Sequence, residues 1–126
     1  MDTGTDRKKI LIVDDSNTNV VLLEAILNNR GYEIITALNV KQAYNMLQKD
    51  RPELILLDLL MPKISGYQFL DQLKKNIDTR EIPVIIVSAV TDIMNIKKTL
   101  DMGAVDYIEK PVDIKTLVRK VEKTLY

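Results

Sequence analysis

The 126-residue sequence contains no cysteine and no histidine. Without cysteine, neither a disulfide framework nor thiolate chemistry is available. Without histidine, the chain lacks the usual general base, the most common metal ligand and any residue of its own that could carry phosphohistidine. Chemistry must therefore rest on carboxylates, hydroxyls, lysines and backbone groups. A phosphohistidine donor, if one is used, must belong to another protein.

Excess charge and long apolar runs are also missing. The 18 basic and 18 acidic residues give a net charge of zero, whereas a nucleic-acid-binding domain usually shows a clear positive excess. No apolar run approaches the roughly 20 residues that span a bilayer, and the polar start of the chain has no signal-peptide core. We therefore expect a cytoplasmic protein with no direct nucleic acid binding and no membrane insertion.

Hydrophobic residues make up 46% of the chain and charged residues 29%, as in an ordinary globular protein of one domain. We predict a polar N-terminal lead-in over residues 1–7 and a single domain over 8–126. Within it, five short apolar runs are predicted to be strands. Several are continuously apolar, as in a parallel sheet covered on both faces. The runs are 10–13, 33–36, 54–57, 84–87 and the weaker 105–108.

Five amphipathic segments alternate with these runs and are predicted to be helices. Their start signals are capping residues, including a capping box at Ser65 and Gln68, with Asn39 and Asp113 before two others. Gly31 is expected to be the residue just past the first helix, and Gly103 to follow the fourth. The alternation predicts a flavodoxin-like, doubly wound (βα)5 fold with strand order 2-1-3-4-5 and right-handed connections.

Apolar stripes define the faces of these helices that should pack on the sheet. In the fourth helix we expect the stripe to be Ile93, Ile96 and Leu100. Met94 and Met102 are predicted to be ordinary packing residues. The basic side chains of the last two helices are predicted to be solvated; these are Lys97, Lys98, Arg119, Lys120 and Lys123.

Acidic residues follow two strands that are neighbours in the predicted sheet. Asp14 and Asp15 follow the first strand and Asp58 follows the third, while Ser88 and Lys110 follow the fourth and fifth. Ligands of such sheets bind at the carboxyl ends of the strands, where the strand order reverses. Three converging carboxylates repel one another unless a cation compensates, and hard oxygen ligands favour Mg²⁺ over zinc.

These residues together suit the transfer of a phosphoryl group to a carboxylate. Such a transfer needs its phosphoryl oxygens neutralised by a metal and a cation. We predict Asp58 as the nucleophile and Asp14 and Asp15 as metal ligands. Lys110 would then bind a phosphoryl oxygen, and Ser88 would donate a hydrogen bond to it.

The same residues, in order at strand ends, resemble the receiver domains of two-component response regulators over residues 8–125. The stretch 57–62 followed by Gly66 is similar to the phosphorylation loop of that family. The resemblance implies that Asp15, Asp58 and the backbone carbonyl of Leu60 bind Mg²⁺ directly, with Mn²⁺ as a substitute and Asp14 acting through water. It also implies Tyr107 as a switch residue and a cis peptide bond at Lys110-Pro111.

The resemblance further implies how the domain works. A sensor histidine kinase or histidine phosphotransfer protein would donate the phosphoryl group, so the chain would not be a turnover enzyme on a separate substrate. Ser88 and Tyr107 would then move inward and change the face made by the fourth helix, the 105–108 strand and the last helix. That face would control a downstream effector or output domain, and a homodimer could form through it. Because Leu60 and Val90 cannot hydrogen-bond an attacking water through their side chains, we expect a long-lived phosphorylated state.

Other interpretations stay open at this stage. Asp14 or Asp15 could be a helix N-cap, Ser88 a turn hydroxyl, Lys110 a surface lysine, and Tyr107 a cover for the sheet edge. A flavodoxin-type electron carrier would need a hydroxyl- and glycine-rich loop where Asp14 and Asp15 stand. A haloacid-dehalogenase-like phosphatase would need a second acidic residue two positions after Asp58, where Leu60 stands. A degenerate receiver that only binds partners is disfavoured by the complete residue set.

Overall fold

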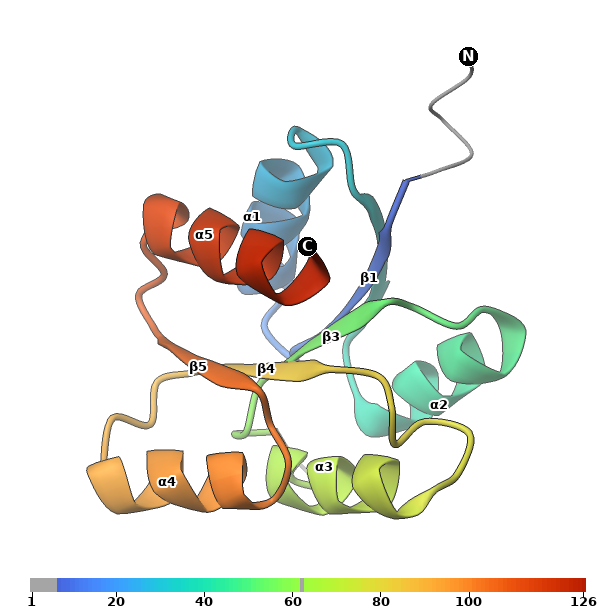
Figure 1. Ribbon diagram of the computed structural model, residues 1–126, viewed down its shortest axis with the longest axis vertical. Coiled ribbons are helices and arrows are strands. Elements are labelled where there is room, and N and C mark those ends of the chain that lie inside the picture. Colours follow the sequence, from blue (N-terminus) through green and yellow to red (C-terminus); the bar gives the residue numbers. More distant parts are fainter. Residues whose placement is uncertain (1–6, 62) are drawn as a thin grey trace.

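Five parallel strands form the middle layer of the fold, with helices on both of its faces (Figure 1). The structure, a computed structural model, describes residues 7–61 and 63–126. The sheet has the order β2-β1-β3-β4-β5, as predicted. Each strand lies within one residue of its predicted limits: β1 Lys9–Val13, β2 Glu33–Ala37, β3 Leu54–Leu57, β4 Val84–Ser88 and β5 Asp106–Glu109.

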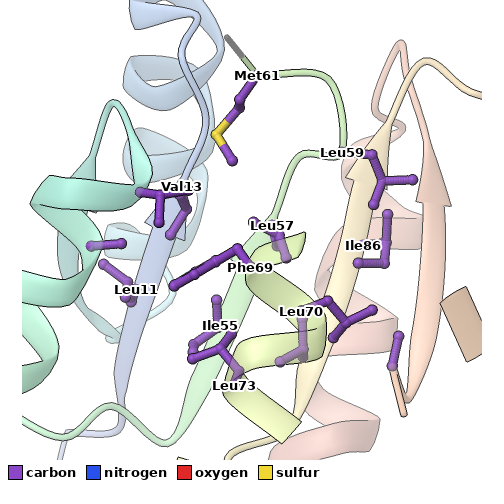
Figure 2. Close-up of a cluster of buried hydrophobic side chains, with 14 of the residues drawn as sticks. Leu11, Val13, Ile55, Leu57, Leu59, Met61, Phe69, Leu70, Leu73 and Ile86 are labelled. Carbon is purple, nitrogen blue, oxygen red and sulfur yellow. The ribbon is translucent and has the colours of Figure 1, made fainter. Parts of the chain in front are cut away.

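The central strands are buried on both faces because alternate side chains enter different hydrophobic clusters. Leu11 and Val13 of β1 face one cluster, whereas Ile10 and Ile12 face the other. Phe69 is fully buried in the first cluster, and Figure 2 shows it beside apolar side chains of β1 and β3. The continuous apolar runs in the sequence therefore reflect a sheet with two cores.

Each helix begins at a side chain that accepts a backbone N–H of its first turn, which satisfies an otherwise unpaired donor. The predicted capping box at Ser65 and Gln68 is confirmed. The N-cap of the first helix is Ser16, so neither Asp14 nor Asp15 has that role. The helices are α1 Asn17–Asn28, α2 Val40–Lys49, α3 Gly66–Lys75, α4 Ile93–Asp101 and α5 Ile114–Leu125.

Two glycines follow helices as expected, but one lies farther out than predicted. Gly103 directly follows the C-cap of α4 with a φ of 113°. The C-cap of α1 is Asn29, so Gly31 lies two residues beyond the cap rather than next to it, with a φ of 92°. Both glycines adopt a left-handed conformation that side chains with a Cβ rarely tolerate.

The predicted packing face of α4 is wrong. Ile93 is 78% exposed, Leu100 is also exposed, and only Ile96 packs partly against the core. Thr99 is the buried residue of this helix, because its hydroxyl donates to the carbonyl of Ile96 and so needs no solvent. The apolar stripe of α4 therefore points largely away from the sheet.

Two smaller predictions about the C-terminal helices are also wrong. Met94 is 78% exposed rather than packed, while Met102 packs partly against the core as expected. Lys120 is not a solvated cation, because its ammonium donates to Asp106 at 3.0 Å and to the carbonyl of Tyr107 at 2.6 Å. Lys120 thereby ties α5 to β5.

The Lys110-Pro111 peptide bond is cis, which confirms the prediction. Within residues 7–61 and 63–126, none of the helices combines the length and the apolar character that a membrane span requires. The predicted polar lead-in over 1–7 lies outside the described residues except for its last residue.

Candidate functional site

The carboxyl ends of β1 and β3 are fastened to their neighbours by backbone hydrogen bonds that continue past the strands. The N–H of Asp14 donates to the carbonyl of Ala37 at 3.1 Å, and the N–H of Asp58 donates to that of Val13 at 2.9 Å. Both acidic residues are thus held in strand register although they lie just beyond the strands. The local fold fixes where their carboxylates emerge.

Three carboxylates meet at this edge, as the sequence predicted. Oxygen atoms of Asp14, Asp15 and Asp58 all lie within 4.8 Å of one another. Asp14 is 2% exposed and Asp58 is 5% exposed, while Asp15 faces solvent. A cluster of hard oxygen donors, accessible from one side, is a set that could hold a metal ion.

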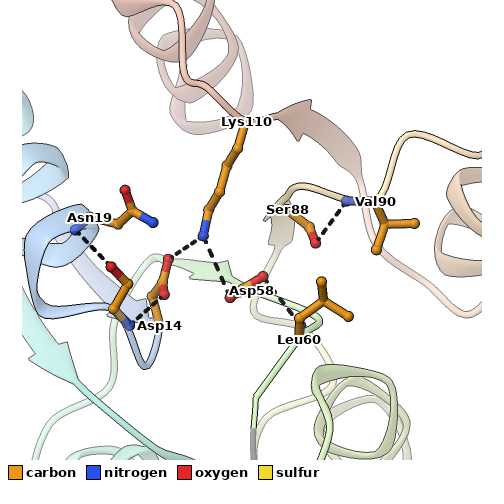
Figure 3. Close-up of polar contacts among 8 residues, drawn as sticks. Asp14, Asn19, Asp58, Leu60, Ser88, Val90 and Lys110 are labelled. Atoms are coloured by element: carbon orange, nitrogen blue, oxygen red, sulfur yellow. Dashed lines mark hydrogen bonds and ion pairs between the residues drawn. The ribbon is translucent and has the colours of Figure 1, made fainter.

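Lys110 provides the positive charge next to these carboxylates (Figure 3). Its ammonium lies 2.8 Å from Oδ2 of Asp14 and 3.5 Å from Oδ2 of Asp58. The N–H of Lys110 also donates to the carbonyl of Ser88 at 2.9 Å, which extends the β4–β5 pairing. Lys110 is therefore positioned by the backbone at the end of β4, and its ammonium contacts the side chains that follow β1 and β3.

Burial raises the pKa of the Asp58 carboxyl above its ordinary value. The positive charge of Lys110 opposes this shift, while the negative charge of Asp14 adds to it. Hydrogen bonds from the N–H of Leu60 and from Ser88 favour the charged form and lower the pKa. The net result is a buried carboxylate that costs free energy in its ionised form unless additional positive charge is nearby.

Ser88 ends β4, and Tyr107 lies in the neighbouring strand β5. Ser88 is fully buried, and its Oγ accepts a hydrogen bond from the N–H of Val90 at 3.4 Å. The ring of Tyr107 is buried, and its hydroxyl donates to the carbonyl of Val90. Tyr107 therefore already points inward in this structure, and the inward movement predicted for it starts from a buried ring. The two residues meet at the same segment after β4.

The loop after Asp58 returns to it at Gly66. The N–H of Gly66 donates to the carbonyl of Leu59 at 3.0 Å. A Cβ on Gly66 would lie 2.2 Å from the carbonyl oxygen of Asp58 and 2.6 Å from Cα of Leu59. Only glycine allows this approach, so α3 begins directly against the backbone of the central carboxylate.

The loop also brings Leu60 next to the carboxylate. Its N–H donates to Oδ1 of Asp58 at 3.3 Å, whereas its side chain is exposed. The role predicted for its carbonyl as a metal ligand stays a prediction. Val90 is half-buried, and Figure 3 shows its side chain toward the same side of Asp58 as that of Leu60.

One residue of this region was not singled out from the sequence. Asn19, in the first turn of α1, lines a small cavity with Lys110 and Pro111, and Figure 3 shows its amide directed toward the lysine ammonium. Its N–H donates to Oγ of Ser16 at 3.3 Å. The only sequence signal for Asn19 was its position one helical turn after the acidic pair, which is too weak to identify it.

Comparison with known proteins gives one consistent family. A family model described as the response regulator receiver domain matches residues 10–122. Protein PilH of Pseudomonas aeruginosa is 36% identical over 117 residues, which cover 93% of this chain and 97% of PilH. The structure of the chemotaxis protein CheY4 of Vibrio cholerae superimposes with a TM-score of 0.88 at 26% identity, covering 94% of this chain and 99% of CheY4.

Longer proteins match as well. The probable transcriptional regulator ycf27 of Cyanophora paradoxa is 37% identical over 120 residues, which cover 95% of this chain and 49% of that protein. The chain thus spans about half the length of these transcriptional regulators.

Proposed function

Because the chain belongs to the response regulator receiver domain family, we propose that Asp58 accepts a phosphoryl group from a phosphohistidine of a partner protein. Receiver domains of this family are phosphoacceptors that interact with histidine kinases and output domains. The observation that carries the proposal is Asp58 itself. It is a buried carboxylate at the carboxyl end of β3, and it shares the ammonium of Lys110 with the second buried carboxylate, Asp14.

We assign the metal site of this reaction to Mg²⁺, with Mn²⁺ as a substitute. The donor set supports it, because three carboxylates with oxygens within 4.8 Å and no nitrogen or sulfur ligand suit a hard divalent cation. Asp15, Asp58 and the backbone carbonyl of Leu60 would hold the ion, with Asp14 acting through water. When bound, the ion would neutralise part of the negative charge on the phosphoryl oxygens.

The residues of the chain would then act as follows. An oxygen of the Asp58 carboxylate attacks phosphorus, a P–O bond forms, and the P–N bond to the donor imidazole breaks. The imidazole nitrogen keeps the electron pair and takes a proton. The ammonium of Lys110 and the hydroxyl of Ser88 stabilise the charge that spreads over the phosphoryl oxygens. The chain is consumed as the acceptor, so it is not a turnover enzyme on a separate substrate.

The output of the phosphorylated domain would involve Ser88 and Tyr107. Both contact the segment at Val90, so a phosphoryl group that attracts the Ser88 hydroxyl alters the packing of that segment. The change would reach the face formed by α4, β5 and α5 and affect a downstream effector or output domain, or a homodimer. The exposed apolar stripe of α4 supports this assignment of the face.

Incubation with acetyl phosphate and Mg²⁺, followed by intact mass measurement, tests the proposal. We expect a single phosphoryl increment that requires Mg²⁺ and is absent in Asp58→Asn. Asp78→Asn, which changes an exposed carboxylate in the turn after the C-terminal end of α3, is the matched control and should be phosphorylated normally. No increment, or an increment that persists in Asp58→Asn, would show that Asp58 is not the acceptor.

We further propose that the phosphorylated state is long-lived. The side chains of Leu60 and Val90 lie toward the same side of Asp58 in Figure 3, and neither offers a hydrogen bond to an attacking water. Leu60→Asn should shorten the lifetime by about tenfold, which corresponds to about 1.4 kcal/mol in the barrier. Decay of the phosphoryl mass increment after removal of acetyl phosphate measures it, with Leu60→Val as the control. Loss within seconds in the unaltered protein would contradict the proposal.

A further inference from the structure

A shallow groove lies between the β2–α2 turn and the β3–α3 loop, outside the carboxylate site. Its volume is about 350 Å³. Its walls are Leu38, Asn39, Val40 and Lys41 from the first segment, and Lys63 and Ile64 from the second. None of these residues has a place in the phosphorylation chemistry described above. We call these six residues the β2–α2 groove.

The floor of the β2–α2 groove is apolar and open to solvent. Leu38 and Ile64 are each 37% exposed, and Val40 beneath them is buried. Apolar side chains that remain exposed next to one another in a concave surface mark contact sites for other molecules. The groove holds about two large apolar side chains, so its size fits a short segment rather than a whole protein face.

Both rims of the groove carry an exposed lysine. Lys41 stands on one wall and Lys63 on the other. Within residues 7–61 and 63–126, neither ammonium lies within 4.0 Å of a carboxylate, a property they share with several other exposed lysines, so both are available to an acidic partner. The unpaired positive charges on each side of an apolar floor complement a segment with apolar side chains between acidic ones.

The backbone conformation of Lys63, in the loop that also carries Asp58, determines where this lysine lies on the groove. Its φ is 67°, and it is the only residue other than glycine with a positive φ in the part of the chain that the structure describes. A lysine in this conformation is strained relative to glycine or asparagine, and such strain clusters at functional sites. The strained backbone positions the Lys63 side chain at the rim of the groove.

The groove is also held in shape from both sides. The N–H of Leu38 donates to the Gln42 side chain at 2.7 Å, and the N–H of Gln42 donates to Asn39 at 2.8 Å, which fixes the first wall. The second wall ends at the capping box of Ser65. A groove that is already formed loses little conformational entropy when a segment binds.

We propose that the β2–α2 groove binds an acidic segment of a partner protein, with one or two large apolar side chains on the floor and carboxylates on Lys41 and Lys63. The occupant is a short protein segment rather than a second copy of the chain. The binding needs no phosphoryl group on Asp58, so it is separate from the proposed function.

Titration of the ¹⁵N-labelled full chain with a short peptide tests the proposal. The probe contains two leucines flanked by glutamates. A second peptide keeps the leucines and has glutamines in place of the glutamates. We expect saturable amide shifts confined to residues 38–41 and 63–64, with the glutamine peptide binding about tenfold more weakly. Addition of salt should weaken the glutamate peptide selectively. Asp58→Asn should bind the probe unchanged, so failure here and failure of the phosphoacceptor proposal remain distinguishable.

Variants separate binding from folding. Lys41→Glu combined with Lys63→Glu should reduce affinity for the glutamate peptide by about tenfold or more. Lys115→Glu combined with Lys123→Glu makes the same change of charge on α5 and should leave affinity unchanged. Lys63→Gly removes one charge and the strained conformation together, so it should weaken binding while raising the melting temperature.

Several results would overturn the proposal. They are equal binding of the two peptides, shifts centred on α4 and α5, and no saturation at about millimolar peptide. Amide shifts in the groove that change with protein concentration alone would instead identify a second copy of the chain as the occupant.

Discussion

Asp58 is a buried carboxylate whose charge is only partly balanced by its surroundings. The ammonium of Lys110 is closer to Asp14, at 2.8 Å, than to Asp58, at 3.5 Å. One cation therefore serves two buried carboxylates, and the third carboxylate, Asp15, adds negative charge at the solvent side. This imbalance makes the site receptive to a divalent cation, and it also makes the ionised form of Asp58 costly when no cation is bound.

The free-energy cost of ionising the buried Asp58 predicts that the stability of the folded protein depends on pH. Because burial raises the pKa of Asp58, the stability contributed by its protonated form is present at acid pH and is lost as the pH rises through the folded-state pKa. Asp58→Asn, which carries no charge, should therefore be more stable than the unaltered protein at neutral pH in chelator. The difference should shrink toward about pH 4, the ordinary value for an aspartate. Urea unfolding at both pH values measures it.

Asp78→Asn is again the matched control, because its side chain is exposed and should show no comparable gain. Added Mg²⁺ should reduce the advantage of Asp58→Asn, since the ion stabilises the charged site of the unaltered protein. An Asp58→Asn variant that is less stable than the unaltered protein at neutral pH would contradict the argument from burial.

At the scale of elements, the β3–α3 connection links the carboxylate to the start of a helix. Gly66 is the first residue of α3, and its missing Cβ allows the helix to begin against the carbonyl of Asp58. The capping box at Ser65 fixes the same helix start. The position of α3 and the position of the Asp58 backbone are therefore coupled.

Gly66→Ala should disturb the position of α3 and the position of the Asp58 backbone. The added methyl group would lie 2.2 Å from a backbone oxygen that cannot rotate away, so the loop or the helix must shift. We expect the free energy of unfolding to fall by about 1–3 kcal/mol, the usual cost of overpacking, and the rate of phosphorylation by acetyl phosphate to fall as well. Chemical denaturation and intact mass measure the two effects.

Gly31→Ala is the control for this prediction. Gly31 has a φ of 92° with open space around it, and it lies far from the site, after α1. It should lose stability through backbone strain but keep its rate of phosphorylation. Equal phosphorylation in Gly66→Ala and the unaltered protein would show that the close approach does not position Asp58.

The elements also show which patterns in the sequence are informative. Strands of the central sheet were predictable because burial on both faces leaves a continuous apolar run, and helix starts were predictable from capping chemistry at Ser65, Asn39 and Asp113. The inner face of α4 could not be predicted, because periodicity identifies an apolar stripe but does not show which part of the protein covers it. Ile93 and Met94 are exposed, and Thr99 is buried through a hydrogen bond to its own helix. Lys120 was missed for a similar reason, since its partner Asp106 lies on a different element.

At the scale of the whole molecule, the topology explains why the site could be read from the sequence. The strand order brings the ends of β1 and β3 side by side, so acidic residues after separate strands must converge. The distances between side chains in the site could not be predicted from the strand order. Neither the closer contact of Lys110 with Asp14 nor the buried ring of Tyr107 follows from strand order, because both depend on side-chain packing. Asn19 lacked a sequence signal altogether.

The ion pair between Lys110 and Asp14 joins residues that are 96 positions apart in the chain. During synthesis, Asp14 and Asp58 leave the ribosome long before the lysine that compensates them, and the first three strands would bring two carboxylates together with no cation between them. An N-terminal half of the domain is therefore electrostatically disfavoured as a separate folded unit. We therefore expect the buried carboxylates at the ends of β1 and β3 to make folding of the domain depend on Lys110, which follows its last strand.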